Sequence, residues 1–154
     1  MTQTTILFTC PDNAVLGPMA EACMNAAGDG RIRAFSAGRD PAQKLHAGVD
    51  RLLRKEGFEM GLFSPKSWDI FAQPHAPRVD MIIALSEDVV GGDEPRWAGA
   101  PARCLWRISS FGDACRSSAR NMPVATLYKR ILIAAEQFAI RADSSQDRAY
   151  LPAA

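Results

Sequence analysis

The sequence predicts an α/β fold with a parallel sheet, because short apolar segments alternate along the chain with amphipathic helical segments. One of them, VDMIIAL at residues 79–85, is a nearly continuous apolar run, as expected for a central strand buried on both faces. Another runs from an N-terminal strand through a cysteine and a short loop into a helix. We therefore expect a three-layer sandwich, in which a central four-stranded parallel sheet carries helices on both faces.

Apolar and β-branched residues predict four strands, at residues 5–9, 32–36, 79–85 and 102–108. Apolar residues at helical spacing predict helices at residues 18–27, 46–56 and 124–142, with a short helix or turn at 68–72. Pro18 suits the first turn of its helix, and Gly28 and Gly57 follow the first two helices as stop signals. Residues 1–142 are predicted to form one domain, and residues 143–154 a polar, flexible tail.

Composition disfavours several classes of partner. The net charge is +1 and the basic residues are scattered, so neither nucleic acid nor an anionic membrane is an expected partner. No apolar run approaches the roughly 18 residues that a membrane span needs. The N-terminal stretch lacks the basic and apolar regions of a signal peptide, so we expect a cytoplasmic protein.

The cysteines do not predict a metal site. Cys10, Cys23, Cys104 and Cys115 form no CxxC pair, and both histidines lie far from them in sequence. We therefore expect free thiols, no metal and no cofactor. His46 and His75 are interpreted as surface or helix-cap residues.

The first loop carries the most specific motif in the chain. It reads Cys10-Pro-Asp-Asn-Ala-Val-Leu-Gly-Pro-Met-Ala-Glu21. This stretch resembles the motif C-x-x-N-x-x-R-S-x-x-A-E of the low-molecular-weight protein tyrosine phosphatases and the related arsenate reductases. Cys10, Asn13, Ala20 and Glu21 match that motif.

Further segments resemble the same family in the same order. They are FSAG at residues 35–38, the stretch 40–66, RVDMIIALSED at 78–88, and WRISSF at 106–111, where the family has a Trp followed by a loop containing Asp-Pro. The resemblance covers about residues 5–139 and implies the low-molecular-weight phosphatase fold.

The resemblance also implies a mechanism and a site. Cys10 is the candidate nucleophile, which attacks phosphorus as a thiolate, and the backbone N–H groups of the loop hold the phosphate or another small anion. An arginine clamps the phosphoryl oxygens, and an aspartate protonates the leaving group. The implied binding loop comprises Pro11, Asp12, Asn13, Ala14, Val15, Leu16 and Gly17.

This chain departs from the family at three catalytic positions. Leu16 stands where the motif has its arginine, Gly17 where it has the loop serine, and Ser110 where it has the general-acid aspartate. Leucine offers no donor to phosphate, and serine is too weak an acid to replace a carboxylic acid at neutral pH. Asp12 adds a negative charge that repels a phosphate dianion. The position of Cys10 favours a lowered thiol pKa, whereas Asp12 and the missing arginine oppose it.

Three hypotheses follow from these departures. The preferred one is a catalytically impaired member, a pseudophosphatase that acts by binding an anion or a protein partner. The second is an active Cys10-dependent phosphatase on an altered substrate, helped by Asp113 as acid or by Arg116 or Arg120 as clamp. The third is an arsenate reductase or thiol-redox protein, which is disfavoured because residues 86–100 contain no cysteine.

Overall fold

The computed structural model describes residues 3–108 and 123–149, with side chains described as far as residue 144. Four strands form the sheet, namely β1 (Thr4–Cys10), β2 (Ile32–Gly38), β3 (Met81–Ala84) and β4 (Ala102–Leu105). The α-helices are α1 (Leu16–Gly28), α2 (Ala47–Lys55) and α3 (Val124–Ala149). Three short 3₁₀-helices complete the described elements, η1 (Met60–Leu62), η2 (Trp68–Ala72) and η3 (Glu87–Val89).

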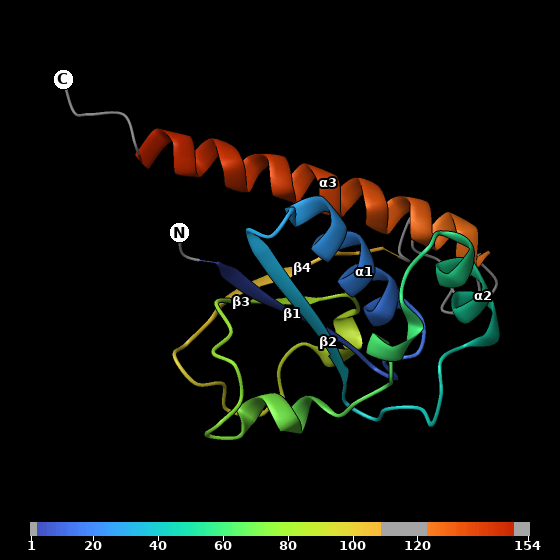
Figure 1. The fold of residues 1–154 in the computed structure, drawn as a ribbon. Coiled ribbons are helices and arrows are strands. Elements are labelled where there is room, and N and C mark those ends of the chain that lie inside the picture. Colours follow the sequence, from blue (N-terminus) through green and yellow to red (C-terminus); the bar gives the residue numbers. More distant parts are fainter. Residues whose placement is uncertain (1–2, 109–122, 150–154) are drawn as a thin grey trace.

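The sheet is parallel throughout, with the strand order β2-β1-β3-β4 (Figure 1). This confirms the predicted four-stranded parallel sheet. β1 pairs with β2 from Thr4↔Ile32 to Cys10↔Gly38, so both strands end at the same edge. The order of strands reverses at β1, and ligands in open α/β sheets bind outside the carboxyl end of such a strand. Cys10 therefore lies where the fold places a functional site.

The three α-helices cover one face of the sheet, and α3 lies along α1 (Figure 1). Side chains of alternate strand residues, Ile6, Phe8 and Cys10 in β1, enter this core together with the apolar faces of the helices. The Phe8 ring packs against Trp106, which also contacts Phe138 of α3. These contacts tie the central strand to the C-terminal helix.

The opposite face is covered by η2 and η3 and the loops around them. Leu7, Ile82, Trp68 and Phe71 are buried in this second core. The predicted short helix or turn at residues 68–72 is the 3₁₀-helix η2. Helices therefore lie on both faces, as predicted, with α-helices on one and 3₁₀-helices on the other.

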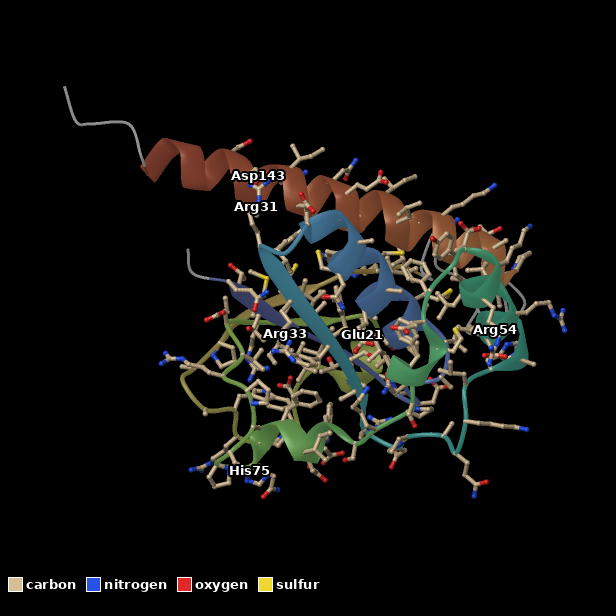
Figure 2. The ribbon with its side chains drawn as sticks, viewed as in Figure 1. Glu21, Arg31, Arg33, Arg54, His75 and Asp143 are labelled. Atoms are coloured by element: carbon tan, nitrogen blue, oxygen red, sulfur yellow. The ribbon has the colours of Figure 1, made fainter. Side chains whose placement is uncertain are left out.

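The main correction to the predicted elements concerns α3. We expected the last helix to end at residue 142 and a polar tail to begin at 143, but α3 continues to Ala149. Asp143 forms an ion pair with Arg31, which precedes β2, and Figure 2 shows the two side chains facing each other. The helical periodicity of a sequence cannot reveal such a pairing between distant segments. Within the described residues, no helix is both long and apolar enough to cross a membrane.

Candidate functional site

The loop between β1 and α1 is held by the segment that follows β2. Backbone N–H groups of Arg39, Asp40, Ala42 and His46 donate to loop carbonyls. Their acceptors are the carbonyls of Cys10 (3.2 Å), Pro11 (2.8 Å), Asp12 (2.9 Å) and Ala14 (3.1 Å). With its carbonyls held from outside, the loop can direct N–H groups inward, as an anion-binding backbone nest requires.

Those inward N–H groups converge on the sulfur of Cys10. The backbone N–H groups of Asn13, Gly17 and Asp12 hydrogen-bond to it, and each lowers the pKa of the thiol. Burial has the larger effect, because Cys10 is only 1% exposed, and the pKa of Cys10 is raised from 9.0 to about 12. The thiol is therefore protonated at neutral pH. Its sulfur donates a hydrogen bond to the carbonyl oxygen of Ala37 at 4.0 Å. Of the opposing influences expected from the sequence, the loop N–H groups lower the pKa and Asp12 raises it, and burial adds the largest upward effect.

Asp12 occupies a further N–H group of the loop. Its Oδ1 accepts a hydrogen bond from the N–H of Ala14 at 3.2 Å, and its charge raises the pKa of Cys10. A carboxylate bonding to the N–H two residues on is a local turn that Asp favours. Asp12 therefore affects the loop in two ways. Its charge repels anions, and its carboxylate accepts the N–H of Ala14, which is then not available to an anion.

Gly17 allows a close packing that a larger residue would prevent. A Cβ atom at this position would lie 2.7 Å from Oδ1 of Asn13 and 2.9 Å from the sulfur of Cys10. Oδ1 of Asn13 is buried without a hydrogen-bond partner among the described residues. The glycine therefore lets the helix start approach the thiol, and it leaves an acceptor unpaired where the family motif carries a serine hydroxyl.

A buried layer supports the loop from behind. Asn13 adopts a left-handed backbone conformation (φ 50), and its Nδ2 donates to the carbonyl of Ser36 at 3.4 Å. The N–H of Ser36 donates to Oε1 of Glu21 at 2.9 Å. Figure 2 shows Glu21 of α1 beside the ribbon of β2. Asn13 and Ser36 thus brace the loop through hydrogen bonds to buried partners.

Glu21 is the second site residue with a strongly shifted pKa. Burial raises the pKa of its carboxyl from 4.5 to about 7, and the charge of Lys66 and hydrogen bonds from Ser36 oppose the shift. Glu21 is 5% exposed. The motif match singled out Glu21 by sequence, but its burial and its bond to Ser36 depend on how α1 packs on β2, which sequence does not reveal.

Leu16 begins α1 and is half-buried. Its side chain packs against the same apolar core as the helices. The residue at the arginine position therefore stabilises the core and supplies no hydrogen-bond donor. Val15 precedes it and provides no side-chain cap for α1.

His46 caps α2, as predicted, because its Nδ1 accepts from the N–H of Gly48 at 3.1 Å. Cys10, Cys23 and Cys104 are free thiols, of which only Cys104 is exposed. Ser110, Asp113, Cys115, Arg116 and Arg120 lie outside the described residues. Within residues 3–108 and 123–149, no cluster of His, Cys, Asp and Glu could hold a metal ion.

The family model for low molecular weight phosphotyrosine protein phosphatase matches residues 5–96. A comparison with curated proteins found no match to this sequence.

Solved structures share the fold at low sequence identity. Thioredoxin-dependent arsenate reductase from Corynebacterium glutamicum is 17% identical, with a TM-score of 0.67 over 94% of this chain, and this chain spans 64% of that protein. An arsenate reductase in the phosphate binding state is 16% identical, with a TM-score of 0.67 over 90% of this chain and 98% of its own. A low molecular weight protein tyrosine phosphatase from Streptococcus pyogenes is 17% identical, with a TM-score of 0.64 over 90% of this chain and 93% of its own.

Proposed function

The chain belongs to the low molecular weight phosphotyrosine protein phosphatase family, and we propose that it is an impaired member that acts by binding. The observation that carries this proposal is the environment of Cys10, a buried thiol with Leu16 at the position of the clamping arginine and the carboxylate of Asp12 in the same loop. Burial and the charge of Asp12 raise the pKa of the thiol. A thiol whose pKa is raised in this way is mostly protonated at pH 7. Because the thiolate is the nucleophile, the attacking species is almost absent.

The residues around Cys10 support the same conclusion. Leu16 supplies no donor for the charge that develops on phosphoryl oxygens, and loss of one such donor typically costs about 10²–10³ in rate. Asp12 bonds to the loop N–H of Ala14 and adds a negative charge. A phosphate that entered the loop would meet fewer free donors than in an undamaged motif, and no clamp from position 16.

Anion binding by the loop is a separate part of the proposal. Inward-facing backbone donors remain, and a solved structure with this fold is an arsenate reductase in the phosphate binding state. We therefore expect weak binding of phosphate at residues 11–17, without rapid turnover. A binding role of this kind suits a protein that recognises a phosphorylated partner and leaves it intact.

The test is phosphate binding and p-nitrophenyl phosphate turnover in wild type beside the double variant Leu16→Arg with Ser110→Asp. The proposal predicts weak phosphate binding without rapid turnover in wild type, and a double variant that binds phosphate more tightly and gains turnover. The matched control is Leu16→Met with Ser110→Asn, which restores neither charge and should match wild type in both measurements. Efficient turnover by wild type that disappears in Cys10→Ser would establish the alternative, an active enzyme in which Asp113, Arg116 or Arg120 supplies the missing group.

The thiol-redox alternative makes a different prediction. It requires a disulfide between Cys10 and a second cysteine after oxidation, and the reduced thiols of Cys10, Cys23 and Cys104 are separate in the described structure. Peptide mass spectrometry of the oxidised protein tests it. Our proposal predicts no disulfide that includes Cys10.

A further inference from the structure

A hollow that includes none of residues 11–17 lies on the sheet face opposite the α-helices. Residues of the segment 91–101, which leads from η3 to β4, and Arg103 of β4 line an open hollow of about 420 Å³. Two arginines, Arg96 and Arg103, line it beside Trp97 and Pro95. A volume of this size matches a small-molecule site.

A buried carboxylate orients one of the arginines. Glu94 forms an ion pair with Arg103, and the side chain of Glu94 is 10% exposed while that of Arg103 is 55% exposed. The guanidinium has five N–H donors in a rigid fork, so a carboxylate on one side holds it while other donors stay available. Arg103 is therefore fixed in place with part of its fork exposed at the hollow.

Arg96 adds a second positive charge to the lining of the hollow. It is exposed and forms no ion pair among the described residues. The two arginines outnumber the one carboxylate of the lining, so the hollow carries a net positive charge. This charge favours an anionic group at the site.

Trp97 gives the hollow an aromatic wall. Its ring makes an edge contact with Trp68, with centroids 6.3 Å apart and an interplanar angle of 81°, which fixes its orientation against the second core. The indole Nε1–H is buried with no acceptor among the described residues. A second cavity, of about 180 Å³, adjoins the same tryptophan. Flat apolar groups pack well against such a ring.

The backbone beside the hollow is strained. Ala100 lines it with φ 48, and the preceding Gly99 has φ 82. A residue with a Cβ rarely adopts this left-handed conformation, and such outliers concentrate at binding and switch sites. The strain, the oriented arginine and the aromatic wall thus coincide at one cavity.

We propose that this hollow binds a small aromatic anion, with its charged group on Arg96 and Arg103 and its ring against Trp97. A phosphate ester and a carboxylate offer the same chemistry to the two arginines. The site includes none of residues 11–17, so a test of this site is independent of the function proposed for the loop.

The experiment is a titration of the ¹⁵N-labelled protein with phenyl phosphate, and separately with benzoate, followed by the indole N–H resonance of Trp97. Trp97→Phe identifies that resonance. The proposal predicts a saturable shift of the Trp97 signal with at least one of the two probes. The probe that binds more tightly distinguishes phosphate from carboxylate.

Variants of the two arginines supply the decisive comparison. Arg96→Ala should weaken binding about tenfold, since it removes a charged hydrogen-bond donor. Arg103→Lys keeps a positive charge that can pair with Glu94 but lacks the forked N–H donors of the guanidinium, so it should also weaken binding. The matched control is Arg51→Ala, an exposed arginine of α2, which should leave the affinity unchanged.

Two results would overturn the proposal. One is the absence of any saturable shift of Trp97 with either probe. The other is a shift that Arg96→Ala and Arg103→Lys leave unaltered. Binding of phenyl phosphate at the loop alone would shift loop amides and leave Trp97 unmoved, so failure here is distinguishable from failure of the proposed loop function.

Discussion

Alkylation of Cys10 provides a quantitative test of its protonation state. Its pKa is raised from 9.0 to about 12, chiefly because the thiol is removed from water. At pH 8 the thiolate fraction is about 10⁻⁴ for a pKa of 12 and about 10⁻¹ for a pKa of 9.0. Because the thiolate is the reactive form, ionisation alone should slow alkylation of native Cys10 about 10³-fold relative to the same thiol in the unfolded chain.

The assay is iodoacetamide labelling at pH 8, followed by peptide mass spectrometry, in native buffer and in urea. Cys104 is exposed and serves as the internal reference in the native protein. We expect Cys104 to be labelled rapidly while native Cys10 remains unmodified, and both to react in urea. Native Cys10 labelling at a rate within about tenfold of its rate in urea would refute the reasoning, because that ratio requires an accessible thiol with a far lower pKa.

Three further predictions concern the loop and its support. Burial raises the pKa of Glu21 to about 7, so its contribution to stability is complete below pH 4.5 and is lost as the pH rises through 7. Glu21→Gln should therefore flatten the fall in Tm between pH 5 and 8, measured by calorimetry, and an unchanged slope would contradict the assignment. Gly17→Ala should lower the free energy of unfolding by about 1–3 kcal/mol in urea titrations, because its Cβ would crowd the sulfur of Cys10 at 2.9 Å. Gly61→Ala has no neighbour within 4 Å, and an equal loss there would show that the cost at Gly17 is not steric. Asp12→Asn keeps a side-chain acceptor but removes a charge, so phosphate affinity by calorimetric titration should rise about three- to tenfold; no change would show that Asp12 does not oppose anions.

Much of the fold was predictable because its signals are local. The apolar run of β3 and the glycines at or just after the ends of the first two helices are signals in neighbouring residues, and all four predicted strands occur in the parallel sheet. β1 extends to Cys10 and β2 to Gly38, beyond the predicted ends, because their last residues pair with each other across the strands. The end of α3 was missed because Asp143 pairs with Arg31, a contact between distant parts of the chain.

The candidate site was only partly predictable. The motif identified Cys10, Asn13 and Glu21 and the substitution at Leu16, all of which lie at or directly behind the loop. The bond from Ala14 to Asp12 could have been found, since an aspartate two residues before an N–H is a known turn signal. The raised pKa of Cys10 could not have been predicted from the sequence. A strand end beside a helix start predicts the N–H groups that lower the pKa, but not the depth of burial that outweighs them.

The most direct test of the central claim is turnover of p-nitrophenyl phosphate by the wild-type protein beside Cys10→Ser, from pH 5 to pH 9. Our account predicts that any hydrolysis is slow and equal in the two proteins across that range, because the thiol stays protonated and no clamp stands at Leu16. A Cys10-dependent rate comparable to that of active family members would contradict it and identify the chain as a working phosphatase.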